Sequence, residues 1–192
     1  MVATFSVYFD WGGTDGTPGT STDIDALGPP TLRFKNADDA TIDANDKLVI
    51  PGAGTKYSFW KHIYLKCDDA DSHTMNNFAI YSDGSNSLGT GIDVKVGLQF
   101  PTKNSGSSAG YEVAAEDEDL VTDHSGISSV ATIFNYTSGE ATDLDITCSE
   151  TSNVIDAANE TTDYVLSQME VINTASPGDL TNETGTFSYD EA

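Results

Sequence analysis

The most closely spaced carboxylates stand in residues 67–72, where Asp68, Asp69 and Asp71 share one predicted turn. Calcium takes several hard oxygen ligands, so carboxylates grouped in this way are candidates for a structural cation site. Their spacing does not match the EF-hand calcium loop, which requires a Glu at its last position. Because Asp is abundant throughout the chain, the alternative is that all three are solvated carboxylates of a turn.

Ligands for zinc and groups for nucleophilic catalysis are too scattered to predict such a site. The residue types that zinc prefers occur without paired spacing, at His62, His73, His124, Cys67 and Cys148. The sequence contains no Gly-x-Ser-x-Gly elbow, no Gly-rich phosphate loop and no His-Glu-x-x-His pattern. We therefore predict a non-enzymatic protein without a cofactor, apart from the candidate cation.

The two cysteines, Cys67 and Cys148, allow two interpretations: a disulfide between two strands, or two buried thiols. The chain starts without the basic region and apolar core of a secretory signal, so we expect synthesis in the cytoplasm. A lone pair of cysteines in such a chain favours buried thiols.

Three aromatic residues, Trp11, Trp60 and Tyr64, are candidates for a carbohydrate-binding platform. An acidic all-β chain with exposed aromatic rings would be typical of a lectin-like module. Aromatic residues in alternating strands are more often core or interface anchors, however, and we favour that interpretation.

The charge balance bears on both environment and partners. Eight basic residues oppose 31 acidic ones, and the formal net charge is -23. Like charges at this density oppose compaction in dilute buffer, whereas at 1 M salt the Debye length falls to roughly 3 Å. The composition thus favours a halophilic source. It argues against nucleic acid and anionic membranes as partners, since phosphate binding relies on Lys and Arg. No segment approaches the roughly 20 apolar residues of a membrane span.

Short alternating runs separated by Gly, Asp, Asn and Ser predict an all-β chain of about ten strands. The expected architecture is an antiparallel β-sandwich of the jelly-roll or immunoglobulin-like kind, with long loops and little helix. The expected strands cover residues 3–9, 31–35, 47–50, 57–66, 74–82, 92–98, 130–136, 144–148, 164–172 and 186–189.

We expect one domain over residues 1–192, with a soft boundary in the Gly/Ser-rich segment 101–110. Residues 10–30 read as a long irregular loop, and residues 112–121 as a short acidic helix. The predicted core residues are Phe5, Phe9, Trp60, Phe78, Val94 and Val96.

The C-terminal region combines a strand over 163–171, an Ala-Ser-Pro-Gly turn at 175–178 and a Tyr-Asp-Glu strand that ends at Glu191. Two internal segments add to this pattern: 32–35 with its acidic turn, and 55–65 leading to 77–84. Together they resemble small β-sandwich virion proteins of haloarchaeal tailed viruses and related phages.

The resemblance implies a structural role in a virus particle and carries over no catalytic residue. The expected location is the virion, as a capsid-surface turret or decoration protein or as a tail or baseplate subunit. The expected partners are copies of the chain, other virion proteins and the host cell surface. The alternative is a surface binding module for host glycan or surface layer, assisted by calcium at Asp68, Asp69 and Asp71.

Overall fold

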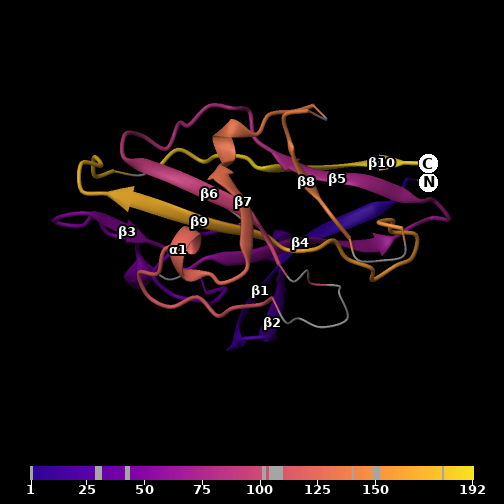
Figure 1. Cartoon of the computed structure of the whole chain (residues 1–192), viewed down its shortest axis with the longest axis horizontal. Helices are drawn as coiled ribbons and strands as arrows, with labels where there is room; N and C mark the ends of the chain where they lie inside the picture. The colour runs from indigo at the N-terminus through magenta and orange to yellow at the C-terminus, as the bar shows by residue number, and fades with distance from the viewer. Residues whose placement is uncertain are drawn as a thin grey trace.

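Two antiparallel β-sheets contain the ten strands of the computed structural model (Figure 1). The structure describes residues 2–28, 32–41, 44–100, 103, 110–139, 141–148, 152–178 and 180–192. Within these ranges the strands are β1 (Thr4–Thr14), β2 (Thr17–Asp23), β3 (Thr55–Tyr57), β4 (Lys61–Asp69), β5 (Met75–Tyr81), β6 (Ile92–Gln99), β7 (Ile127–Thr132), β8 (Leu144–Ile146), β9 (Val165–Ile172) and β10 (Thr186–Glu191). The predicted all-β class and antiparallel sandwich are confirmed.

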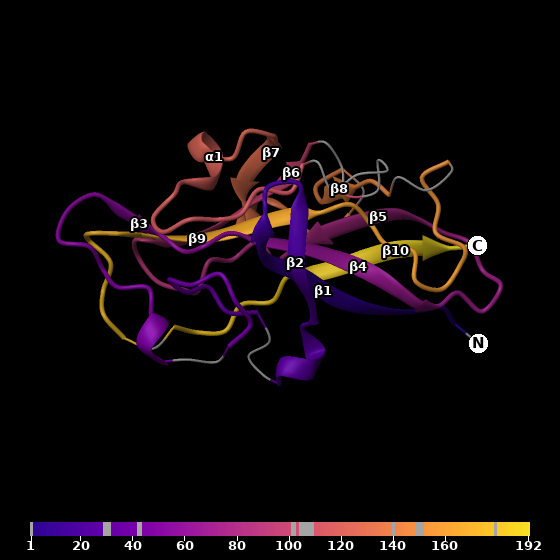
Figure 2. The same cartoon turned by 90° about the horizontal axis from the view of Figure 1, so that it is seen from below.

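The larger sheet follows the order β2-β1-β4-β9-β6-β7, and β3 pairs with β9 off this path. In the β1–β4 pair, Phe5 lies opposite Cys67 and Phe9 opposite Ile63. The smaller sheet has the order β10-β5-β8. Figures 1 and 2 show β5 and β10 running toward the end of the molecule where both termini lie, so the smaller sheet packs against that end of the larger one.

The inner faces of the two sheets meet in an apolar core. Phe78, Val94 and Val96 are buried there, as predicted. Phe5 is half-buried, and its ring centroid lies 5.9 Å from that of Phe78 and 4.7 Å from that of Tyr189. Strand β6 alternates buried and half-exposed residues over most of its length, which confirms the period-two pattern of the sequence.

The outer face of the larger sheet is covered by residues 110–126. Trp60 packs there with Leu120 and Leu166, and Tyr64 packs with Tyr111 and Tyr164. The sheet is therefore buried on both faces over its middle strands, which explains the nearly continuous burial of β4.

The helix predicted over 112–121 is wrong for most of its length, because only α1 (Leu120–Asp123) forms. Backbone carbonyls of the preceding residues accept side-chain hydrogen bonds instead of helical ones. Glu112 O accepts from Trp60 Nε1 at 2.9 Å, and Glu118 O accepts from Gln168 Nε2 at 2.7 Å. Tertiary contacts with the sheet thus outweigh local helix preference.

Three further expectations, all in the first half of the chain, are wrong in whole or in part. The predicted loop over 10–30 is wrong at its start, because β1 continues to Thr14 and pairs with β2 in a hairpin. The strands predicted over 31–35 and 47–50 are absent from the described residues 32–35 and 47–50. Phe34 and Leu48 supply their apolar side chains to the core from loops, so burial alone produced the strand-like pattern.

Three remaining expectations concern the linker, the thiols and the membrane. The Gly/Ser segment 101–110 lies outside the described residues except at Lys103 and Gly110. Cys67 and Cys148 are both buried and form no disulfide with each other, as favoured. Among the described residues, no helix has the length and apolar character needed to cross a membrane.

Candidate functional site

The predicted cation turn lies at the end of β4. Asp68 and Asp69 are successive strand residues and point to opposite faces, so they do not converge on one ion. Asp68 Oδ2 accepts a hydrogen bond from Ser6 Oγ at 2.6 Å, and Asp69 Oδ1 accepts from the backbone N–H of Asp71 at 2.9 Å. Across the described residues, no group of three or more His, Cys, Asp or Glu side chains is placed to hold a metal. A cation at this turn stays a prediction.

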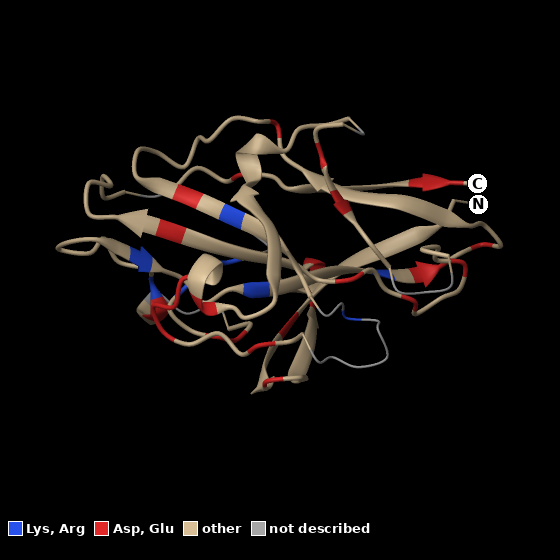
Figure 3. Ribbon diagram, viewed as in Figure 1, with Lys and Arg blue, Asp and Glu red and all other residues tan. Residues whose placement is uncertain are grey.

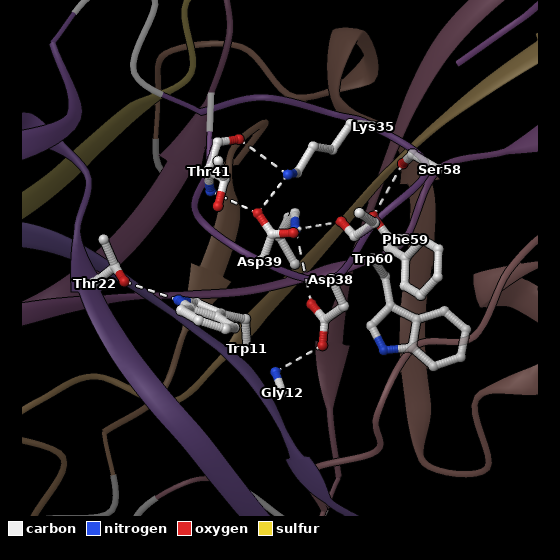
Figure 4. Close-up of polar contacts among 12 residues, drawn as sticks. Trp11, Gly12, Thr22, Lys35, Asp38, Asp39, Thr41, Ser58, Phe59 and Trp60 are labelled. Carbon is white, nitrogen blue, oxygen red and sulfur yellow. Dashed lines mark hydrogen bonds and ion pairs between the residues drawn. The ribbon is translucent and has the colours of Figure 1, made fainter. Parts of the chain in front are cut away.

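The candidate carbohydrate platform is divided between the interior and the surface. Trp60 is 2% exposed and Tyr64 is 4% exposed, so both are core anchors and neither offers a ring to a sugar. Trp11 is half-buried, and its Nε1 donates to Thr22 Oγ1 at 2.8 Å across the β1–β2 hairpin (Figure 4). The three rings do not form one exposed surface.

A polar cluster that sequence reasoning missed surrounds Asp10 of β1, whose side chain is buried beneath the outer cover. The phenols of Tyr64 and Tyr164 both donate to its carboxylate, Tyr64 at 3.2 Å, and Ser21 Oγ donates as well. Burial and the negative charge of Asp10 raise the pKa of both phenols above the ordinary value. The two tyrosines therefore remain protonated donors, and the cluster holds a carboxylate inside the protein.

Two buried histidines, His62 and His124, adjoin this cluster with ring centroids 6.2 Å apart. Burial lowers the pKa of His62 well below its usual value, and burial also lowers that of His124 in spite of the nearby carboxylate of Glu112. His124 Nδ1 accepts from the N–H of Gly126 at 3.1 Å. Both rings are thus neutral, and each Nε2 lacks a hydrogen-bond partner among the described residues. Two such nitrogens fall short of the four ligands of a structural zinc site.

A second buried polar cluster joins β4 to the loop that follows residue 35 (Figure 4). Lys61 is fully buried, and its Nζ lies 3.7 Å from Asp38 Oδ1 and 5.3 Å from the ring centroid of Phe9. Asp38 Oδ2 also accepts from the N–H of Gly12 at 2.7 Å. Burial lowers the pKa of Lys61 to about 8 and raises the pKa of Asp38.

Lys35 holds the same loop from its other side (Figure 4). Its Nζ donates to Asp39 Oδ1 at 2.5 Å and to the backbone carbonyl of Thr41 at 2.9 Å. Burial would raise the pKa of Asp39, but the hydrogen bonds from Lys35 and Thr41 outweigh it and lower the pKa. These contacts fix the irregular segment 35–41 in place.

Chemically, these clusters hold protons and charges inside the protein without exposing them to a substrate. An amine with a lowered pKa is the type of group used as a base or a nucleophile. Lys61, however, has no exposed surface, and His62 and Asp10 have almost none. The clusters therefore stabilise the packing of loop and cover on the larger sheet.

The chain was compared with protein families, curated proteins and solved structures. No family model, curated protein or solved structure matches the chain. Its function therefore has to be argued from its own surfaces and interior.

The accessible surface has two prominent features, its acidity and a sheet edge. Acidic residues are distributed over loops and strand ends, whereas basic residues are few (Figure 3). Strand β10 pairs with β5 on one side and forms an edge of the smaller sheet on the other. Asp190 and Glu191 lie exposed on this strand, while Phe187 and Tyr189 pack against the core.

Proposed function

We propose that this chain is a non-enzymatic structural subunit of a haloarchaeal tailed virus particle. Its place would be the outer surface of the capsid, as a turret or decoration protein, or the tail and baseplate. It would act through contacts with copies of itself and with other virion proteins. The observation that best supports this proposal is the edge of the smaller sheet at β10 (Thr186–Glu191).

An edge strand exposes backbone N–H and C=O groups that can pair with a strand of another chain. Charged side chains on an edge oppose such pairing, and β10 carries Asp190 and Glu191. The resulting repulsion acts over the Debye length, which shrinks from about 10 Å at 0.1 M salt to about 3 Å at 1 M. Pairing through β10 is therefore favoured in brine and opposed in dilute buffer.

The test is the native mass by light scattering, from about 0.1 M to about 3 M KCl, with and without a chelator. We expect a monomer in dilute salt and a closed oligomer in molar KCl that is indifferent to the chelator. A chain that is monomeric at every salt concentration would overturn the proposal. A monomer that loosens when divalent ions are removed would instead favour the calcium-assisted binding module.

A pair of charge variants localises the interface. Asp190→Asn removes a charge from the edge, so the oligomer should form at lower KCl than for the unaltered chain. Asp123→Asn makes the same change at an exposed position of α1, in the cover of the larger sheet, and should leave the salt dependence unchanged. Equal shifts for the two variants would show that net charge governs assembly, and the β10 edge would lose its role.

A further inference from the structure

A cavity of about 900 Å³ lies between the two sheets. Its apolar walls come from both layers: Val7, Ile63, Val96 and Met169 of the larger sheet, and Ile80 and Phe187 of the smaller. In the part of the chain that the structure describes, the smaller sheet has three strands, and loops cover the rest of the inner face of the larger sheet. Figure 2 shows these loops on the lower side of the molecule, where the described residues 24–28, 32–41, 44–54, 173–178 and 180–185 run without strands.

The volume and lining are those of a ligand site. Pockets for small molecules have volumes of about 300–1,000 Å³, with mainly apolar walls and a few polar groups that orient the ligand. Three basic residues are among the lining: Lys35, which is engaged by Asp39, and Arg33 and Lys47. An apolar enclosure with cations among its lining residues fits a ligand that has an apolar body and an anionic head.

Arg33 and Lys47 are exceptional in this chain. Arg33 is the only arginine, and its Nε is buried without a hydrogen-bond partner. Among the described residues, neither Arg33 nor Lys47 has a hydrogen bond or an ion pair. The other six basic residues contact a carboxylate (Lys35, Lys56, Lys61 and Lys95) or an aromatic ring (Lys66 and Lys103). In a chain with 31 acidic residues, two basic residues without an ion pair that line one cavity favour the binding of an anionic ligand from solution.

The acidic groups that line the cavity do not provide that partner. Asp46 lies 3.9 Å from the Nζ of Lys35, and Glu183 accepts a hydrogen bond from the N–H of Ser87 at 2.6 Å. Asp25, the third, is exposed on the 3-10 turn Asp25–Leu27 and makes no ion pair with a described residue. None of these three acidic residues therefore neutralises the charge of Arg33 or Lys47.

We propose that the inter-sheet cavity binds a single-chain anionic amphiphile of the fatty-acid type. The hydrocarbon chain lies between the sheets, and the carboxylate is held by Arg33 and Lys47. A guanidinium presents its N–H groups in a planar fork that matches a carboxylate. Because the head-group contact is partly buried, molar salt screens it less than a surface ion pair. This inference concerns the interior of one chain and does not depend on its assembly into a particle.

The first test compares head groups on the unaltered chain. Potassium decanoate, decanol and decyltrimethylammonium are titrated into the protein in about 2 M KCl, each below its micelle concentration, and binding is followed by calorimetry. We expect saturable binding of one decanoate per chain, weaker binding of decanol and no binding of the cation. Absence of saturable decanoate binding, or equal affinities for decanoate and decanol, would overturn the proposal.

The second test uses variants matched in charge. Hydrogen bonds to charged groups contribute enough that Arg33→Gln should weaken decanoate binding by about tenfold or more. Lys47→Gln should weaken it less, because Lys47 is exposed. Lys66→Gln makes the same charge change beside Tyr8 and should bind decanoate like the unaltered chain. An Arg33→Gln protein that binds with unchanged affinity would refute the assigned head-group site. The head-group comparison stays decisive if Arg33→Gln does not fold.

The third test locates the ligand with methyl-labelled methionine. Met169 lines the cavity, whereas Met75 is fully buried in the core and does not line it. Decanoate should shift the methyl resonance of Met169 in proportion to the bound fraction and leave that of Met75 in place. Binding without a Met169 shift would place the ligand elsewhere and overturn the proposal.

Discussion

Tyr164 donates a hydrogen bond to the carboxylate of Asp10 across β4, which lies between β1 and β9 in the larger sheet. Tyr164 lies directly before β9, and Asp10 lies in β1. Tyr64 of the intervening β4 donates to the same carboxylate. One buried carboxylate therefore connects β1, β4 and the residue that leads into β9 on the outer face of the larger sheet.

The hydrogen bond from Tyr164 to Asp10 predicts how much stability is lost when the hydroxyl of Tyr164 is removed. Hydrogen bonds to charged groups contribute about 1.5–3 kcal/mol, so Tyr164→Phe should lower the free energy of unfolding by about that amount. The control is Tyr8→Phe, since the Tyr8 ring stacks on Tyr64 at 5.8 Å and its hydroxyl has no hydrogen bond to a described residue. Chemical denaturation in molar KCl measures both. Equal losses for the two variants would contradict the role assigned to Asp10.

The buried amine of Lys61 predicts a pH dependence of stability. Its pKa is lowered from 10.5 to about 8 by burial, so between these values the unfolded chain binds more protons than the folded one. The free energy of unfolding should therefore rise with pH in this window, by about 3 kcal/mol at most for this group. Above pH 10 the rise should reverse, because the raised pKa values of the buried phenols favour protons in the folded state.

Variants isolate the contribution of Lys61 from other groups. Burial also lowers the pKa of Lys103, which adds to the same rise, so the difference between two variants is the quantity to measure. Lys61→Met should flatten the profile from about pH 8 to 10, whereas Lys66→Met should keep it. If both variants keep the full rise, Lys61 is charged in the folded protein at high pH.

The core packing predicts a large loss of stability when one phenylalanine is replaced by alanine and almost none when another is. Phe78 is 1% exposed and contacts Phe5, so Phe78→Ala should lower the free energy of unfolding by about 3–5 kcal/mol. Phe100 is 69% exposed, and Phe100→Ala should change it by no more than about 0.5 kcal/mol. A Phe78→Ala protein with an unchanged melting temperature would contradict the predicted strand over 74–82 and its place in the core.

The sequence allowed the strands to be predicted where alternation was strict. The run Ile92, Val94, Val96 and Leu98 has one apolar face, and β6 forms there. Prediction was wrong where burial came without strand pairing, as at Phe34 and Leu48, which lie in loops linked by the Lys35–Asp46 ion pair. Local pattern carries no information on such long-range partners.

The buried polar clusters illustrate the same limit. Lys61 stands in an otherwise apolar run, which was the one available signal that its amine would need a buried partner. Which of the many carboxylates it meets depends on the path of the loop that carries Asp38. The inter-sheet cavity was likewise beyond prediction, because it depends on how much of one sheet the other covers.

Salt dependence tests the interpretation of the acidic surface. Acidic residues are distributed over loops and strand ends (Figure 3), and four of the seven lysines are engaged by carboxylates, so repulsion among the remaining acids is poorly compensated. Screening should reduce that repulsion, and the melting temperature should rise from about 0.1 M to about 3 M KCl. Glucose at matched viscosity serves as a control for general solvent effects. A melting temperature that stays flat over this range would remove the halophilic interpretation and, with it, the salt-dependent assembly argued for β10.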